Sequence, residues 1–328
     1  MADSKKIHLL VMGDFAWDVL IRTNSRLLPG GDAFGEVMFA PGGSAANVAV
    51  WAQRCGLTTH FIGKIGKDRF GSLAEENLQW ENVQAHFIRS EEHRTAAVAV
   101  WIDESGQRSM VSGRGADFYL LKSELPLQVL QKAEHLHLSA WSLFTNPPRT
   151  ASQYASEIIH KNKATLSLDP ASFQMISKIG RDNCLLWMKA LKPHIFFPNL
   201  EEGRILTDRE TPQDILKTLA ELFPETLLVL KLDARGAMIF FDDEFIPIQP
   251  QTENLIDATG AGDAFAGAFL AKYLRYPDPV EAAHFAVAVS SWVVNHIGAR
   301  PKPDNQLERI LKSSLNHSQP QKTEDTTF

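Results

Sequence analysis

The sequence contains little cysteine, no long apolar run and no excess of positive charge. Cys55 and Cys184 are the two cysteines in 328 residues; they lie far apart and match no metal-ligand spacing. This excludes a disulfide framework and is typical of buried, reduced thiols. No apolar run is long enough to cross a bilayer. The run 7–12 after Lys5-Lys6 is too short for a signal-peptide core, so we expect a cytoplasmic protein with no membrane partner.

The charge balance argues against a second class of partner. The net charge is −6, which leaves no basic face for nucleic acid. Anionic substrates must therefore be held by local features such as helix N-termini and a few Arg or Lys side chains. A hydrophobic fraction of 44% supports a substantial core, and the length suits one large α/β domain or two small ones.

Strand-like and helix-like patterns alternate along most of the chain. This alternation predicts a mostly parallel sheet with helices on both faces. We expect one domain over 1–312 and a polar, disordered tail over 313–328. The expected strands are 7–12, 60–65, 133–139, 165–169, 195–198, 226–232 and 237–241, and the expected helices are 47–55, 70–80, 148–161, 182–190, 211–222, 264–273 and 279–295.

Two segments interrupt this alternation, and we expect them to form a small β lid. The runs 95–102 and 108–112 flank Glu104-Ser105-Gly106-Gln107, which is a hairpin pattern. The segment 16–40 is mixed and contains the turn Pro29-Gly30-Gly31. The lid would comprise about 16–40 and 95–115 and cover the carboxyl edge of the sheet. Its exposed edge is suited to pairing in a homodimer.

The most informative string is Asp257-Ala258-Thr259-Gly260-Ala261-Gly262-Asp263-Ala264-Phe265-Ala266-Gly267. Gly260, Ala261 and Gly262 are expected to present free N–H groups at a helix N-terminus, which stabilises an anion. Asp263 beside them is suited to take a proton from a hydroxyl while phosphate charge develops nearby. The alternative is a glycine-rich loop that only enters a buried helix. The spacing matches neither a Walker A loop nor a dinucleotide fingerprint.

This string resembles the C-terminal signature of the ribokinase-like (PfkB) family of carbohydrate kinases. Two further motifs stand in family order, Pro41-Gly42-Gly43-Ser44-Ala45-Ala46-Asn47-Val48-Ala49 and Asn199-Leu200-Glu201-Glu202, and the resemblance covers about 7–312. It implies a three-layer α/β/α sandwich with a mostly parallel central sheet and a β lid. It also implies transfer of phosphoryl from ATP with Mg²⁺, Asp263 as the base and the neighbouring N–H groups as charge stabilisers.

On the nucleotide side, the resemblance implies that Asn199 and Glu202 lie around the phosphates and Mg²⁺, with the metal held largely through water. The same residues also fit a helix cap. Lys231 either reaches the phosphates or is an ordinary lysine at the end of a strand. The remaining positions assigned to nucleotide binding are Gly236 in a turn, and Ala286 and Ser290, which suit an adenine pocket or plain core.

The resemblance also implies a monovalent cation site formed mainly by carbonyl oxygens. Lys302 stands where ribokinases carry a hydroxyl residue, so potassium dependence is a hypothesis. The positions that match this site are Asp257, Thr259, Val293, His296 and Gly298.

On the sugar side, the resemblance implies that Asp18 accepts bonds from two adjacent hydroxyls, which suits a diol. Asp14 either assists it or caps a loop. Asn47 either binds the sugar or simply begins a helix. Arg114 either contacts a substrate oxygen or carboxylate or only braces the lid. Backbone approach to the sugar is permitted by Gly42 and Gly43.

Two departures from the family pattern bear on the substrate. Ser44 replaces the Lys of ribokinases and phosphosugar kinases, and Ser139 replaces a ribose-binding Glu. Runs 106–110 and 114–117 resemble fructokinase-like and keto-deoxy-gluconate-kinase-like members. We therefore expect transfer to a primary hydroxyl of a small unphosphorylated sugar or sugar acid, with a fructokinase-like substrate first. The alternatives are a nucleoside kinase, with a pocket near Phe15, Trp17 and Trp141, and a catalytically silent binding or regulatory subunit.

Overall fold

The larger of two sheets forms the centre of the molecule. The computed structural model describes residues 6–25, 28–102, 108–251 and 255–316, and within them this sheet has nine strands. Strands from β11 to β5 run parallel, while β12 and β13 are antiparallel additions at one edge. In spatial order the strands are β13 (Glu244–Ile248), β12 (Ala237–Phe241), β11 (Leu227–Lys231), β10 (Ile195–Phe196), β9 (Thr165–Asp169), β8 (His135–Ser139), β1 (Leu9–Met12), β4 (Thr59–Gly66) and β5 (Gln84–Ser90).

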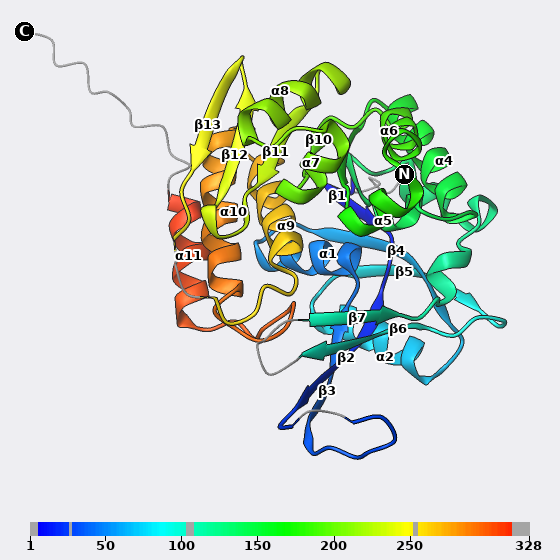
Figure 1. The fold of residues 1–328 in the computed structure, drawn as a ribbon. Helices are drawn as coiled ribbons and strands as arrows, with labels where there is room; N and C mark the ends of the chain where they lie inside the picture. The colour runs from blue at the N-terminus through cyan, green and yellow to red at the C-terminus, as the bar shows by residue number, and fades with distance from the viewer. Residues whose placement is uncertain (1–5, 26–27, 103–107, 252–254, 317–328) are drawn as a thin grey trace, which may run out of the picture.

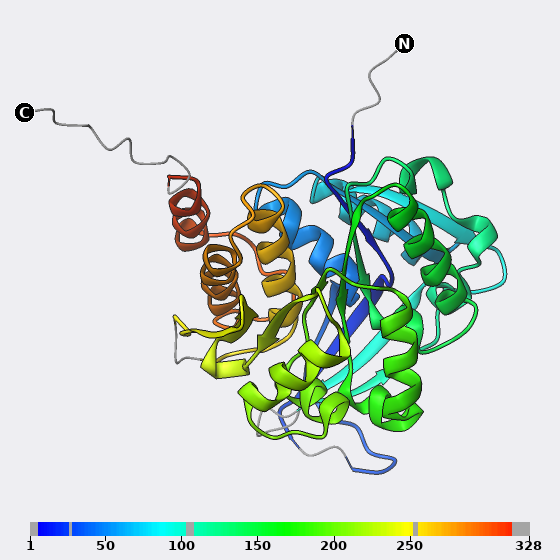
Figure 2. The ribbon, with the colours of Figure 1, turned by 90° about the horizontal axis from the view of Figure 1, so that it is seen from above.

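Strand β1 explains why helices cover both faces of this sheet. Successive side chains of a strand point to opposite faces, and every residue of β1 is apolar and buried. Leu9 and Val11 enter one core with the first helix group, and Leu10 and Met12 enter the other with the second. Figure 2 shows the two groups on either side of the sheet. The first group contains α1 (Ser44–Arg54), α2 (Arg69–Trp80), α9 (Ala261–Tyr273), α10 (Pro279–Val293) and α11 (Asn305–Asn316), and the second α3 (Leu127–Leu130), α4 (Pro148–Lys161), α5 (Phe173–Ile179), α6 (Arg181–Ala190), α7 (Leu200–Thr207) and α8 (Pro212–Leu222).

The second sheet is small and lies to one side of the main body (Figure 1). Its order is β3 (Gly35–Gly42), β2 (Ala16–Thr23), β6 (Ala96–Ile102) and β7 (Arg108–Ser112). The three-layer fold with a separate small sheet is therefore confirmed, and the small sheet uses the two segments predicted for it. The hairpin connection 103–107 lies outside the described residues.

The predicted end of the domain at residue 312 stays a prediction, and it falls inside a helix. Helix α11 continues to Asn316, because an apolar stripe through Leu307, Ile310 and Leu311 packs it against the first core. The rest of the predicted tail, 317–328, lies outside the described residues. Among the residues that are described, no helix has the length and apolar character needed to cross a membrane.

Candidate active site

The N-terminus of α9 is shaped by Gly260. This residue caps the helix with φ 71°, and a Cβ there would lie 2.5 Å from the Cβ of Ala299, so only glycine fits. Ala261 differs from the prediction, because its N–H donates to the carbonyl oxygen of Ala258 at 3.3 Å. Across the described ranges, the N–H groups of Gly260 and Gly262 have no acceptor. The helix therefore begins with free donors, as an anion site requires.

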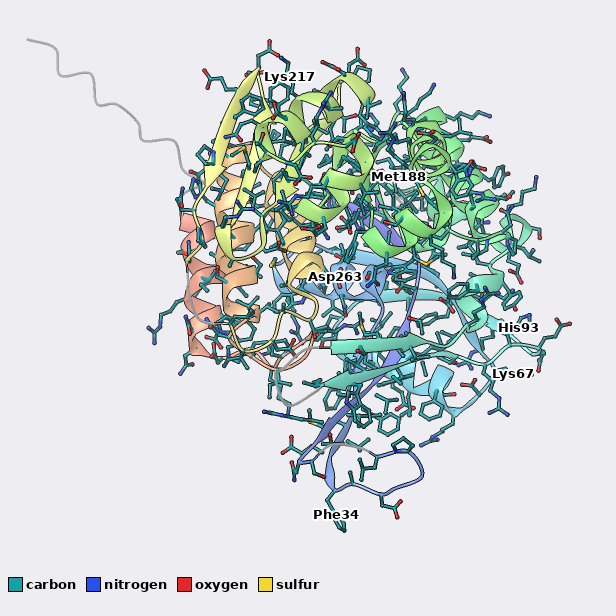
Figure 3. The ribbon with its side chains drawn as sticks, viewed as in Figure 1. Phe34, Lys67, His93, Met188, Lys217 and Asp263 are labelled. Carbon is teal, nitrogen blue, oxygen red and sulfur yellow. The ribbon has the colours of Figure 1, made fainter. Side chains whose placement is uncertain are left out.

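Two cavities meet at this helix turn. Gly260 and Asp263, three residues apart on one face of α9, line a first cavity of about 240 Å³ between the small sheet and the main body. Ala261 and Gly262 line a second cavity of about 390 Å³ beside β11 and α10. Figure 3 shows Asp263 near the middle of the molecule, between the small sheet and the main sheet. One turn of helix thus borders both cavities.

Asp263 has the environment of a general base. Burial raises the pKa of its carboxyl to about 7, although a hydrogen bond from Asn47 opposes that shift. Asn47 Nδ2 donates to Asp263 Oδ2 at 2.8 Å across 216 residues of sequence. A base is most effective when its pKa lies near the working pH. This carboxyl can therefore accept a proton from an alcohol in the first cavity.

Most residues predicted for the sugar side line the first cavity. Asp14, Asp18, Gly43 and Asn47 do so. Asp14 also caps α1, accepting from the N–H groups of Ser44 and Ala45 at 2.8 and 3.2 Å. Burial raises the pKa of Asp14 and takes that of Asp18 to about 6, with Arg300 opposing both shifts.

Gly42 and Arg114 stand apart from this group. Gly42 does not line the first cavity but leaves room for Asp18, since a Cβ there would lie 2.4 Å from Asp18 Oδ2. Arg114 is exposed and does not line the cavity in this structure. Its role as a substrate ligand stays a prediction.

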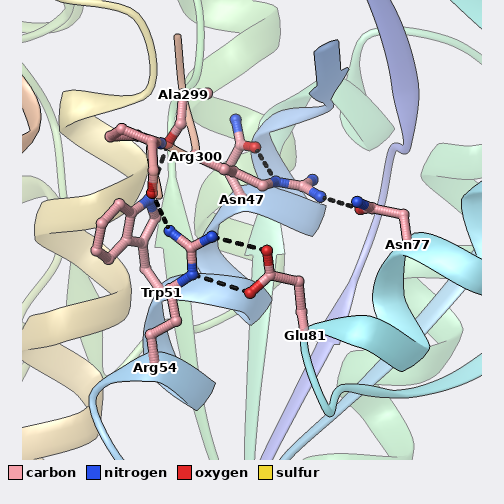
Figure 4. A network of polar contacts seen from close by, with 8 residues as sticks. Asn47, Trp51, Arg54, Asn77, Glu81, Ala299 and Arg300 are labelled. Atoms are coloured by element: carbon pink, nitrogen blue, oxygen red, sulfur yellow. Dashed lines mark hydrogen bonds and ion pairs between the residues drawn. The ribbon is translucent and has the colours of Figure 1, made fainter. Parts of the chain in front are cut away.

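Arg300 is a residue that the sequence reasoning missed. Its Nε donates to Asn47 Oδ1 at 2.7 Å, its Nη1 to Asn77 Oδ1 at 2.8 Å and its Nη2 to the carbonyl oxygen of Gly42 at 2.9 Å. Figure 4 shows the bonds from Arg300 to Asn47 and Asn77, with Arg54 and Glu81 paired beside them. Because Asn47 in turn holds Asp263, Arg300 positions the Asp263 carboxyl through one intervening side chain.

The second cavity collects most residues predicted for the nucleotide. Asn199, Lys231, Gly236 and Ser290 line it. Ala286 does not; it is fully buried in the first core. The residues of this segment that face the cavity are Val287, Ser290, Ser291 and Val294, spaced three and four apart as one helical face requires. Ala286 precedes Ser290 by four residues but is buried against the core, so its assignment to the adenine pocket stays a prediction.

Asn199 and Glu202 form a helix cap as well as bordering this region. Asn199 Oδ1 accepts from the N–H of Glu202, and Glu202 Oε2 accepts from the N–H of Asn199, each at 2.8 Å. This reciprocal pair is a capping box for α7. The cap interpretation is therefore confirmed. Glu202 is buried and does not line the second cavity, so its part in holding a metal stays a prediction.

Lys231 is paired with Asp169, a second residue that the sequence reasoning missed. Asp169 ends β9, and its carboxylate binds the Lys231 ammonium. Burial acts to lower the pKa of Lys231, but Asp169 and Glu202 outweigh it and the net shift is upward. Burial, reinforced by Asp169, raises the pKa of Glu202. The ammonium lies 3.4 Å from where a Cβ of Gly262 would stand, so a permanent positive charge borders the helix start.

The loops predicted for a monovalent cation lie side by side. Asp257 Oδ1 accepts from the N–H of Thr259 at 2.6 Å, and Oδ2 accepts from the N–H of Gly298 at 2.9 Å. The N–H of His296 donates to the Val293 carbonyl at 2.9 Å. The five predicted residues therefore belong to one pair of neighbouring loops. Whether their carbonyl groups bind a cation stays a prediction.

Two adjoining cavities, with a buried carboxyl in the first and a free helix N–H group and a lysine in the second, are what a phosphotransferase that acts on an alcohol requires. The pfkB family carbohydrate kinase model matches residues 6–305. The chain belongs to this family and is an ATP-dependent sugar kinase.

Individual relatives and solved structures are similar to the chain in sequence or in fold. The chain is 30% identical to a fructokinase of Escherichia coli over 267 residues, covering 79% of this chain and 82% of that one. The fold matches that of adenosine kinase from Sinorhizobium meliloti with a TM-score of 0.83 at 20% identity, covering 95% and 100% of the two chains. It also matches an Escherichia coli protein assigned to the ribokinases, in complex with ATP and Mg²⁺, with a TM-score of 0.78 at 21% identity, covering 94% and 99%.

Proposed function

We propose that the protein transfers the γ-phosphoryl group of MgATP to a primary hydroxyl of a small unphosphorylated sugar or sugar acid. The supporting observation is the shared helix turn, which presents Asp263 to the first cavity and Gly262 to the second. The sugar would occupy the first cavity and ATP the second. A fructokinase-like substrate is favoured, because the fructokinase relative is 30% identical.

In this mechanism the acceptor hydroxyl gives its proton to Asp263, and its oxygen bonds to the terminal phosphorus as the bond to ADP breaks. The N–H groups at the start of α9 and the Lys231 ammonium stabilise the charge on the transferred group. The hydrogen bond from Asn47 holds the Asp263 carboxyl in place for this proton transfer. Closure of the small sheet over the sugar would exclude water and limit hydrolysis of ATP.

The residues around Lys231 fit a nucleotide-bound Mg²⁺. The described residues contain no cluster of three or more His, Cys, Asp or Glu side chains able to hold a metal alone. Mg²⁺ characteristically keeps several waters and shares carboxylates with substrate phosphates. Asn199, Asp169 and Glu202 supply oxygen atoms suited to such waters. When bound, the metal neutralises phosphate charge.

A potassium ion at the loops around Asp257 is a further proposal; equal activity in K⁺ and in a bulky organic cation would contradict it.

A screen for ADP release over sugars, sugar acids and nucleosides tests the function, and Asp263→Asn tests the mechanism. Loss of the base should lower turnover by about 10²–10⁴-fold and leave ATP binding intact, because Asp263 does not line the second cavity. The matched control is Asp182→Asn, which changes an exposed carboxyl on α6. Near-full turnover by Asp263→Asn would contradict the assignment.

The two alternatives have less support. Phe15 is buried in the first core and Trp17 packs against it, so of the three aromatic residues named for a nucleoside pocket only Trp141 lines the first cavity. A volume of about 240 Å³ also falls below the roughly 300–1,000 Å³ of pockets for drug-sized ligands. A catalytically silent subunit does not require a carboxyl group that can accept a proton near neutral pH, such as that of Asp263.

We further propose that the protein acts in the cytoplasm, without nucleic acid or membrane partners.

A further inference from the structure

Two polar atoms on the wall of the first cavity have no partner. Asp117 Oδ1 and Thr145 Oγ1 are buried and, among the described residues, form no hydrogen bond. Both residues line the cavity. Buried polar atoms in native proteins are nearly always paired, so each unpaired atom requires an explanation. A ligand that carries its own hydrogen-bonding groups would supply the missing partners.

Both atoms belong to segments that the fold holds in place. Asp117 lies in the 3₁₀ helix η1 (Ala116–Tyr119), directly after the small sheet. The N–H of Ala116 donates to the carbonyl of Arg94 at 2.8 Å, and a Cβ on Gly115 would lie 2.4 Å from Ala96 Cα. Thr145 lies between the 3₁₀ helix η3 (Ala140–Leu143) and α4. The two unpaired atoms therefore come from two separate segments of the chain that both line the first cavity.

The charges on the cavity wall restrict the ligand further. The carboxyl groups of Asp14, Asp18, Asp117 and Asp263 line the cavity, and no Lys or Arg side chain of the described ranges does. The Nε, Nη1 and Nη2 atoms of nearby Arg300 are all engaged. Burial raises the pKa of Asp117 to about 8, so its carboxyl holds a proton at neutral pH and can both donate and accept. A carboxylate or phosphate group on the ligand would instead be repelled by the carboxylates of the wall, and its charge would be buried without a cationic partner.

We propose that Asp117 and Thr145 form a second hydroxyl-binding subsite of the first cavity, which selects an uncharged polyhydroxylated sugar and disfavours sugar acids and sugar phosphates. This inference rests on the proposed function, because it narrows the acceptor of that same site. Neither residue is needed to position Asp263, whose partner is Asn47. The subsite should therefore act on sugar binding rather than on the chemical step.

The test compares three acceptors that share one carbon skeleton: fructose, 2-keto-gluconate, in which one CH₂OH is a carboxylate, and fructose 6-phosphate. The wild-type kcat/KM should be highest for fructose by at least about tenfold. Thr145→Val and Asp117→Ala should each raise the KM for fructose about 10–100-fold and leave the KM for ATP unchanged. Asp117→Asn should restore most of the loss, because an amide also donates and accepts. The matched control is Thr150→Val, an exposed site on α4.

Several results would overturn the subsite. An unchanged KM for fructose in Thr145→Val and Asp117→Ala is one, and a wild-type preference for either anion is another. Arg114→Ala is included as well. If this variant loses activity with 2-keto-gluconate and keeps its activity with fructose, Arg114 recognises sugar acids. If the enzyme releases ADP with none of these acceptors, the proposed function fails. Direct titration of the protein with fructose then still tests the subsite, because Thr145→Val and Asp117→Ala should each bind fructose more weakly than the wild type.

Discussion

At the scale of single residues, the site depends on carboxyl groups whose protonation is set by burial. Asp263 and Asp18 line the same cavity, and burial raises their pKa values to about 7 and about 6 respectively. The hydrogen bond from Asn47 favours the charged form of Asp263 and so limits its rise. The proposed base is consequently divided between its two protonation states near neutral pH.

This gives a prediction for the pH profile. Because Asp263 must be deprotonated to accept a proton, kcat/KM should rise with pH through about 7. Asn47→Ala removes the bond to the charged form, so the rise should move to higher pH. The control is Asn77→Ala, which contacts Arg300 but not Asp263. A profile measured from pH 5 to 9 that rises at the same pH in both variants would argue against Asp263 as the titrating group.

Sequence reasoning found the residues within motifs and missed those that only the fold assembles. Asp263 and Asn47 are 216 residues apart, and each was found within its own motif. Arg300 follows a loop with no pattern, so nothing in the sequence links it to Asn47. Asp169 offered a usable signal, since an acidic residue at the end of a predicted strand lies at the ligand-binding edge.

At the scale of elements, the clearest predictions came from strong local signals. The capping pattern at Asn199 offered the start of α7, a helix absent from the expected ones, and the glycines before α9 indicated a second start, although α9 begins at Ala261, three residues earlier than expected. Helix α10 shows the limit. It is apolar nearly all round, so its sequence does not reveal which face lines a cavity, and of the two residues predicted there only Ser290 lines it.

Arg300 joins three elements, and removing it should affect both stability and turnover. Its donors serve α1 through Asn47, α2 through Asn77 and the end of β3 through Gly42. Arg300→Met should lower the free energy of unfolding by about 1–3 kcal/mol for each buried acceptor left unpaired. It should also lower kcat, because Asn47 loses its support. Denaturant unfolding and steady-state kinetics measure the two effects.

Arg54→Met is the control for this experiment. Arg54 binds Glu81 and the carbonyl of Pro301 in the same network but does not contact Asn47 (Figure 4). It should lose stability and keep kcat at temperatures where the protein remains folded. Equal losses of kcat in the two variants would mean that Arg300 acts on folding alone.

At the scale of the whole molecule, the small sheet exposes a terminal strand and apolar side chains on it. Strand β3 is terminal in its sheet, and Val37 and Phe39 on the side away from the first cavity are each 61% exposed. Phe34 lies at the far tip of this sheet (Figure 3). Exposed edges and contiguous apolar patches are both characteristic of association sites. We propose that a second copy of the chain covers this surface.

Sedimentation over a range of concentrations tests that proposal. The wild type should sediment as a dimer, and Val37→Lys should shift it toward the monomer, because a buried ammonium at the interface has no partner. Leu186→Lys, a change at an exposed apolar residue of α6, is the control and should not alter the assembly. A wild type that remains monomeric at all concentrations would rule the dimer out.

The division of the two cavity walls along the chain has an evolutionary consequence. Apart from Ala171 and the turn at 259–263, the first cavity is built from residues 12–148, and the second from residues 199–294. Mutations in the first half can therefore change which alcohol is accepted without disturbing the phosphoryl donor. A gene copy freed from selection could acquire a new acceptor through substitutions confined to its first 150 codons.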